Sequence, residues 1–293
     1  MALKYKMRAL EDPSNNYVFW TSDIPDLTGT DAPVSIVNGT ATILSVGGEL
    51  DGATPGPVDF YPIDEYDLVQ WKCNQTNIPI INYGTAGTGA NLTTASNIRY
   101  SNKANPRSIY PCVFFTSNGA YLSTANGVVQ PTGDITVSLY LMTSTPNPGG
   151  DNMFLCKRYL SVTSGVEPIA ALNLCRTNGS VGTCCVPTAS NIEFNTAIST
   201  YGWTHIGWSR SASTGQYKTY INGVRTNTGT TPTGDINWSG TGLVSKTPGP
   251  WRVGFAGTGS IAPNFWYVQD IRIANTVRDE AWFLAMYNHL IGT

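Results

Sequence analysis

Charged residues are scarce in this sequence, since Asp, Glu, Lys and Arg make up 12% of its 293 residues and the formal net charge is −2 at pH 7. A near-neutral chain has no basic footprint for nucleic acid or for an anionic membrane, and neither partner is expected. No apolar run is long enough to span a bilayer. The first sixteen residues also lack the apolar stretch of a secretory signal, which predicts synthesis in a reducing cytoplasm.

Metal-binding residues are also few. The chain has two histidines and six cysteines, and no two cysteines follow the C-x-x-C spacing of a zinc site. In a reducing compartment, cysteines usually pack as small apolar side chains. We therefore favour free thiols over a zinc site for Cys73, Cys112, Cys156, Cys175, Cys184 and Cys185.

Short strands and tight turns account for much of what is present. In residues 203–210 the side chains alternate with period two, and a short polar segment leads to a second alternating run at 217–221. Asn222-Gly223 follows, the dipeptide that best tolerates the positive φ angles of a type I′ turn. The pattern predicts three antiparallel strands in sequence, a β-meander.

The meander resembles the laminin-G-like (concanavalin A-like lectin) family in its pentraxin-related bacterial and phage form. Later segments match the family's order, with a strand at 251–255 and a bulged strand at 265–273 that ends in Asp-hydrophobic-Arg-hydrophobic. Upstream, 134–140 and 154–158 match two further strands. The resemblance implies an all-β fold, an antiparallel jelly-roll β-sandwich over residues 66–293 with a short C-terminal helix. It implies no single activity.

The closing helix is expected to begin near Thr276, which can cap it, with Asp279 completing a capping box. One side of this helix carries Val277, Ala281, Leu284 and Asn288, with Trp282, Met286 and Tyr287 beside it, and the helix is expected to pack on a sheet. Aromatic residues at strand period usually lie in a core. We expect that placement for Trp203, Trp208 and Trp266.

Residues 1–65 do not fit the family pattern, and prolines and glycines break them into pieces too short to hold a core. We interpret them as an N-terminal arm rich in strands, with hairpin 34–44 turning at Asn38-Gly39. Such an arm can dock on a neighbouring subunit by strand addition, or it can cover its own domain. Candidate assembly residues in its apolar strand are Tyr17, Phe19 and Trp20.

Ligand-binding candidates come from loops. Trp238 and Trp251 lie among Gly, Ser and Pro, where an exposed indole can stack on a sugar or on a partner protein. Asn152 joins them as a loop amide. The family's relatives often hold Ca²⁺ with loop oxygens, so the resemblance makes calcium possible, with Asp151 and Asp235 as metal ligands. No other cofactor is expected.

Catalytic motifs are absent. Glycoside hydrolases of similar fold need two facing carboxylates, as in E-x-D-x-E, and that motif does not occur. The acidic cluster 64–67 lies at the boundary with the arm, and no Ser-centred elbow, HExxH or Cys-His pairing is present. The expectation is a protein that is not an enzyme.

The function that this combination predicts is structural. Low charge and a lectin-like sandwich without an export signal resemble bacteriophage virion proteins, such as capsid decoration (cement) proteins and head or tail fibre components. The expected location is the virion, the expected partners are capsid or other virion proteins, and homo-oligomers are plausible. The alternative is a receptor-binding lectin that recognises a host-surface glycan, and a third hypothesis is a glycoside hydrolase.

Overall fold

The structure is a computed structural model, and it divides the chain into two compact units, residues 1–56 and 57–293. The structure describes residues 60–101, 111–117, 119–143, 154–159, 202–236, 248–254 and 266–291. For seven further strands, β1 to β4 and β12 to β14, it describes the backbone only. The second unit begins at residue 57, and within it the guanidinium of Arg272 donates hydrogen bonds to the carbonyls of Tyr61 and Pro62.

The first unit contains two separate antiparallel pairs. Strand β1 (Arg8–Glu11) pairs with β2 (Tyr17–Trp20), and β3 (Val34–Val37) pairs with β4 (Thr40–Ile43). The second pair confirms the hairpin predicted around Asn38-Gly39.

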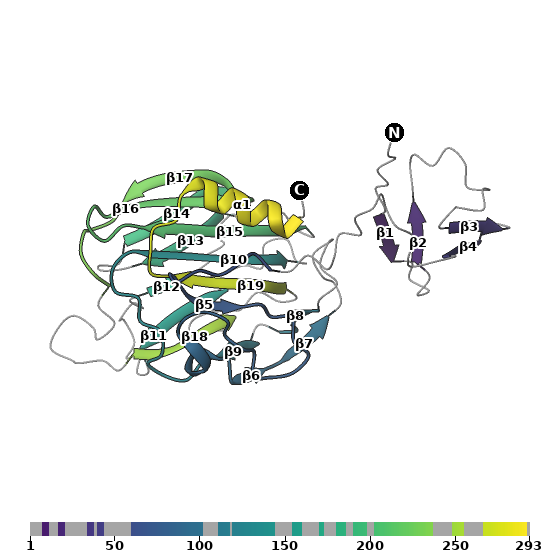
Figure 1. Cartoon of the computed structure of the whole chain (residues 1–293), viewed down its shortest axis with the longest axis horizontal. Helices are drawn as coiled ribbons and strands as arrows, with labels where there is room; N and C mark the ends of the chain where they lie inside the picture. Colours follow the sequence, from purple (N-terminus) through teal and green to yellow (C-terminus); the bar gives the residue numbers. More distant parts are fainter. Residues whose placement is uncertain are drawn as a thin grey trace. The chain divides into compact units, whose positions relative to one another are not determined.

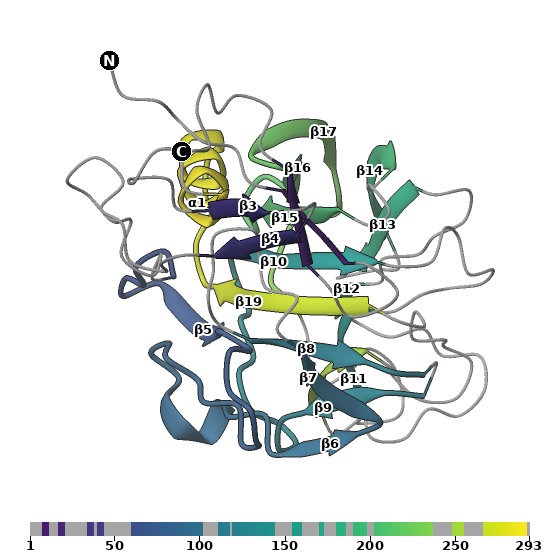
Figure 2. The same cartoon turned by 90° about the vertical axis from the view of Figure 1, so that its right-hand side faces the viewer.

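The second unit is an all-β sandwich of two antiparallel sheets, as predicted (Figure 1). The larger sheet runs β17 (Val224–Thr230), β16 (Gln216–Ile221), β15 (Trp203–Arg210), β10 (Ile135–Thr143), β19 (Trp266–Ala274), β8 (Cys112–Phe115), β7 (Ile98–Ser101), with β5 (Asp67–Trp71) also paired to β19. The smaller sheet runs β14 (Ser190–Ala197), β13 (Ser180–Cys185), β12 (Ala170–Leu172), β11 (Leu155–Tyr159), β18 (Pro248–Gly254), β9 (Tyr121–Ser123), β6 (Thr94–Ser96). Strands β5 and β8 follow one another along the same edge of β19 (Figure 2).

The predicted meander is confirmed as β15, β16 and β17. Strand β15 pairs antiparallel with β16, and β16 pairs antiparallel with β17. Asn222 and Gly223 join the last two with φ angles of 52° and 79°, and this is the conformation that their sequence favours.

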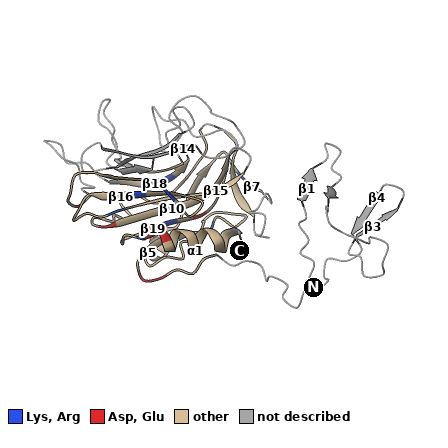
Figure 3. Ribbon diagram, turned by 90° about the horizontal axis from the view of Figure 1, so that it is seen from above, with Lys and Arg blue, Asp and Glu red and all other residues tan. Residues whose placement is uncertain are grey.

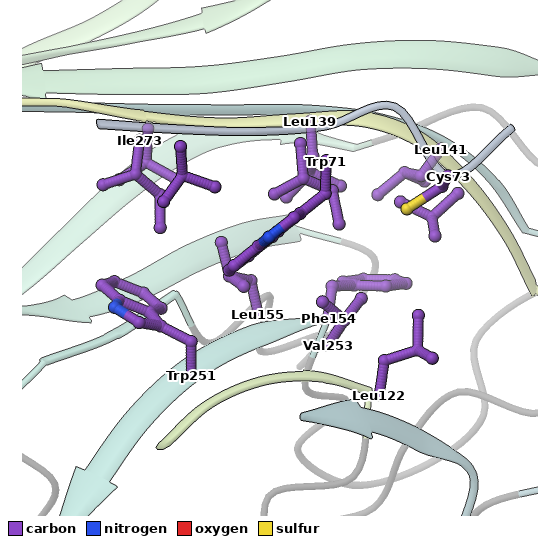
Figure 4. Packing of buried hydrophobic residues seen from close by; sticks show 14 of the residues in the cluster. Trp71, Cys73, Leu122, Leu139, Leu141, Phe154, Leu155, Trp251, Val253 and Ile273 are labelled. Carbon is purple, nitrogen blue, oxygen red and sulfur yellow. The ribbon is translucent and has the colours of Figure 1, made fainter. Parts of the chain in front are cut away.

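The core lies between the two sheets (Figure 4). Alternate residues of the larger sheet, such as Trp71, Leu139 and Ile273, face Leu155 and Val253 of the smaller sheet, and all five are buried. Of the tryptophans expected in the core, Trp208 and Trp266 are buried. Trp203 is half-buried and stacks on Tyr140 outside this core, with ring centroids 4.9 Å apart.

A bulge interrupts β19, as the resemblance implied. Ser138 pairs with Arg272 and Tyr140 with Gln269, so that two residues of β19 face one residue of β10. Asp270, in the bulge, has a φ of 42°. Charged residues are sparse over the described ribbon (Figure 3), yet this strand buries both Asp270 and Arg272.

Helix α1 (Glu280–Ile291) closes the fold, but its cap and its buried face differ from those predicted. Asp279 caps it, since its carboxylate accepts a hydrogen bond from the backbone N–H of Trp282 at 2.9 Å. The buried residues are Phe283, Met286 and Leu290, whereas Val277 and Leu284 are exposed. Phe283, Met286 and Leu290 are spaced by three and four residues, so they lie on one face of the helix. No helix in the described ranges is long and apolar enough to cross a membrane.

The predicted free thiols are confirmed for three of the six cysteines. Cys73, Cys112 and Cys156 are buried and form no disulfide. Burial raises the pKa of the Cys73 thiol, so it is held in the protonated form and packs as an apolar side chain. The side chains of Cys175, Cys184 and Cys185 lie outside the described residues.

Candidate functional site

Trp251 is not a surface residue, so its prediction as a ligand-binding residue is wrong. Its side chain is 2% exposed, and its indole N–H donates to the carbonyl of Val129 at 2.8 Å. The ammonium of Lys157 lies 5.7 Å from its ring centroid and donates to the carbonyls of Val128 and Gly249. Burial lowers the pKa of Lys157 to about 8. Trp251 lies in β18, at a position whose side chain faces the core. Its glycine- and proline-rich neighbours are more typical of a surface loop.

Most other predicted site residues lie outside the described part of the chain. This applies to Trp238, Asn152 and Asp151, and to the side chains of Tyr17, Phe19 and Trp20. Asp235 is described and exposed. Among the described residues, no group of three or more His, Cys, Asp or Glu side chains is placed to hold a metal ion. Calcium binding at Asp151 and Asp235 therefore stays a prediction.

Two tyrosines stand out on the described surface because they alone among the described aromatic residues are strongly exposed. Tyr66 is 45% exposed and Tyr83 is 42% exposed. Tyr66 immediately precedes β5 in the sequence. Tyr83 lies beside β5, because its backbone N–H donates a hydrogen bond to the carbonyl of Gln70 at 3.0 Å. Exposed aromatic rings near an ordered strand are candidates for ligand contact.

The loop after Tyr83 is held in place by the buried amide of Asn82. Its oxygen accepts hydrogen bonds from the backbone N–H groups of Gln70 at 2.9 Å and Gly84 at 3.0 Å. Its nitrogen donates to three carbonyls, those of Leu68, Gly84 and Gly87. One side chain thus fastens the loop to β5 at both ends, which preorganises the surface beside Tyr83.

Backbone contacts fix the same loop further. The N–H groups of Thr85 and Ala86 donate to the carbonyls of Asp67 and Leu68, at 2.8 and 3.0 Å. At Gly84, an added Cβ would lie 2.5 Å from the backbone of Leu68, so this close approach requires glycine. A 3₁₀ turn, Gly87–Ala90, ends the loop.

A cation lies against Tyr83. The Nζ of Lys72 is 4.5 Å from the Tyr83 ring centroid and 5.2 Å from that of Phe60. Aromatic rings attract a cation over their faces, so this contact orients both the ammonium and the tyrosine. Together, the exposed Tyr83 ring, Lys72 and the exposed loop residues Thr85 and Thr88 form a preformed surface that we call the Tyr83 platform.

The surroundings of Tyr66 are committed to other interactions. The guanidinium of Arg278 lies 5.7 Å from its ring centroid, but it donates to the carboxylates of Asp64 at 2.6 Å and Asp67 at 3.2 Å. The hydrogen bond from Arg278 lowers the pKa of Asp64. Burial raises the pKa of Asp67, against the opposing charge of Arg272. These charged groups pair with one another at the junction of β5 and β19. Few polar groups beside Tyr66 therefore remain to bind a ligand.

The sequence analysis named no residue of the Tyr83 platform as a candidate for ligand binding. A tyrosine directly before a Gly/Thr-rich loop was the available signal. What the sequence could not show is that Asn82 and Gly84 dock this loop on β5 and leave the Tyr83 ring outside.

No family model matches the chain, and no curated protein matches it either. Solved structures do match in fold. Domain 4 of AbnA, an extracellular arabinanase from Geobacillus stearothermophilus solved with arabinotriose, matches with a TM-score of 0.53 at 16% identity over 76% of this chain and 98% of that one. The binding domain of Paraclostridial Mosquitocidal Protein 1 matches with a TM-score of 0.54 at 12% identity, over 76% of this chain and 52% of that one.

A third structure is the ligand-binding domain of botulinum neurotoxin serotype D, solved in complex with N-acetylneuraminic acid. It matches with a TM-score of 0.50 at 14% identity, over 76% of this chain. The matched region spans about half of each of the two toxin chains. At these identities the likeness shows the fold alone, an antiparallel jelly-roll β-sandwich.

Proposed function

We propose that the protein binds carbohydrate without transforming it, and that the Tyr83 platform is the binding surface. The observation that carries this proposal is an exposed aromatic ring, 42% accessible, beside a loop that Asn82 holds rigid. The apolar C–H face of a sugar ring can stack on such a ring, and nearby hydroxyl and ammonium groups can hydrogen-bond its hydroxyls.

Two observations support this proposal. The first is the fold, since two of the solved structures that share it were obtained with a bound sugar, arabinotriose in one and N-acetylneuraminic acid in the other. The second is the state of the buried carboxylates. Within the described ranges these are Asp67 and Asp270, and both are paired with Arg272. Carboxylates committed in this way do not supply a glycosidase with its acid and its base.

The test compares two tyrosines of similar exposure. On a glycan array and then by calorimetry with the best ligand, the Tyr83→Ala protein should lose at least tenfold in affinity, about 1.4 kcal/mol. Tyr66→Ala is the matched control and should bind like the parent protein. Equal losses in both variants, or binding that survives in Tyr83→Ala, would exclude the platform. Trp238→Ala in the same assay tests the sequence-based prediction for that residue.

A role in a virion is a second hypothesis, and the separate N-terminal unit, residues 1–56, favours it. In this hypothesis the first unit attaches the sandwich to capsid neighbours or to other copies of the chain, and the sandwich is displayed on the particle. Full-length protein and a chain starting at Pro57 would be compared for oligomeric mass and for co-sedimentation with candidate particles. Attachment that does not need residues 1–56 would contradict the hypothesis.

A further inference from the structure

The outer face of the smaller sheet carries a second aromatic–cation pair, whereas the Tyr83 platform lies beside β5 of the larger sheet. Leu122 and Val253 point into the core, so their neighbours Tyr121 and Arg252 lie on the opposite face. Both are half-buried, and the guanidinium carbon of Arg252 lies 5.2 Å from the Tyr121 ring centroid.

Within the described part of the chain, the guanidinium of Arg252 forms no hydrogen bond or ion pair, and its one ring contact is with Tyr121. Other arginines with little exposure are bonded: Arg210 donates to Thr231 and to two carbonyls, and Arg272 donates to Asp270. The strands β6, β9 and β18 contain no Asp or Glu.

Arg252 is half-buried, so its guanidinium can bind a ligand while the Tyr121 ring helps to hold it in place. Its backbone is fixed, because the flanking Trp251 and Val253 are buried in the core. A planar fork of N–H donors held in this way matches a carboxylate, which it can bind through two parallel hydrogen bonds.

Several hydroxyl side chains lie on the same face of the smaller sheet as Arg252 and Tyr121. In the sheet register Arg252 pairs with Ser123, which pairs with Thr94, and Tyr121 pairs with Ser96. The hydroxyls of Thr94, Ser96 and Tyr121 have no partner within the described ranges. Neighbouring strands are about 4.8 Å apart, so two strand spacings span roughly the length of two linked sugar rings.

We propose that Arg252 and Tyr121 form a second binding site, which takes the carboxylate of an acidic sugar in a polysaccharide chain. Arg252 binds the carboxylate, Tyr121 stacks on the sugar ring, and the hydroxyls of Thr94 and Ser96 contact the adjoining residues. The site rests on the proposed carbohydrate-binding function, but it is independent of the Tyr83 platform.

The experiment uses the full-length protein with polygalacturonate and with the same polymer after reduction of its carboxyl groups. The parent protein should bind the acidic polymer at least tenfold more tightly at constant ionic strength. Arg252→Gln should abolish this preference, and Arg252→Lys should reduce it, because an ammonium keeps the charge but lacks the fork. Arg99→Gln removes an exposed arginine of β7 in the other sheet and controls for net charge.

The outcomes separate the two proposals. Equal binding of the acidic and the reduced polymer by the parent protein would overturn the Arg252 site, and this comparison needs no variant to fold. Equal effects of Arg252→Gln and Arg99→Gln would overturn it as well, by showing that only net charge matters. An acid preference that persists in Tyr83→Ala supports the site, whereas loss of neutral-glycan binding in that variant reports on the Tyr83 platform alone.

Discussion

The carboxylate of Asp270 accepts hydrogen bonds from the Nε of Arg272 at 3.2 Å to each oxygen, although the two residues are only two positions apart on β19. Asp270 lies in the bulge of β19, and Arg272 lies at the end of it, opposite Ser138. Asp270 also accepts from Gln70 at 2.8 Å, and Arg272 lies 3.6 Å from Asp67. This buried network joins β5 to β19.

Replacing Arg272 with methionine should destabilise the sandwich strongly. The change leaves Asp67 and Asp270 buried without their main counter-charge, and breaking a buried pair in this way typically costs about 3 to 5 kcal/mol. Urea denaturation would measure it. In Arg225→Met, the control, an exposed pair with Glu280 at 3.9 Å is lost, and the free energy of unfolding should change by less than about 1 kcal/mol. Similar values for both variants would contradict the network's role.

Acid should weaken the fold through His205. This side chain is fully buried beside α1, 6.0 Å from the Phe283 ring, and neither ring nitrogen has a partner among the described residues. Burial, aided by the charge of Arg272, lowers its pKa to about 3. Between pH 6.5 and 3 the unfolded chain therefore binds a proton that the folded chain does not, and stability falls as the pH falls, by up to about 1.4 kcal/mol per unit.

The measurement is the free energy of unfolding between pH 7 and 5, above the range where most carboxylates titrate. His205→Asn should flatten the slope in this range. An unchanged slope in His205→Asn would show that other groups cause the acid sensitivity.

Two glycines of the Tyr83 loop should respond differently to alanine. At Gly84 the new Cβ would meet the Leu68 backbone at 2.5 Å, which forces the loop off β5 and costs about 1 to 3 kcal/mol or more. At Gly89 nothing lies within 4 Å, so stability should be unchanged or rise by up to about 1 kcal/mol. Thermal denaturation of the two variants distinguishes these outcomes, and Gly84→Ala should also weaken glycan binding.

The cap of α1 offers a direct test of which residue begins the helix. Asp279→Ala removes the acceptor for the Trp282 N–H and should cost about 1 kcal/mol. Thr276→Ala should change the free energy of unfolding by less than about 0.5 kcal/mol, because no hydrogen bond of its side chain is present among the described residues. A larger loss at Thr276 than at Asp279 would place the cap where the sequence pattern suggested.

Local patterns were enough to predict the meander β15–β17, because strand alternation and the Asn222-Gly223 turn act over a few residues. The bulged strand with Asp270 and Arg272 was also predictable, through the resemblance. For α1 the sequence predicted the existence of the helix but not its buried face. Two capping candidates three residues apart left the first residue of the helix open, and the buried face depends on which side of the helix meets the sheet in the folded protein.

Side-chain exposure was the weakest part of the prediction. Trp251 was expected at the surface from its glycine and proline neighbours, yet it is buried, whereas Tyr83 was not considered and is exposed. Which face of a strand or loop is covered depends on elements distant in sequence. For Trp251 these include Thr124, Val129 and Lys157.

The all-β class, the turns and the succession of strands follow from local sequence, because they depend on the period of apolar residues and on the conformational preferences of Asn and Gly. The tertiary structure alone decided which polar groups are paired and which remain available. Asp67, Asp270 and Arg272 neutralise one another only after β5 and β19 pair, and Arg252 meets Tyr121 only after β18 pairs with β9. Pairing between distant strands is set by how the whole chain buries its apolar surface, and no local pattern encodes it.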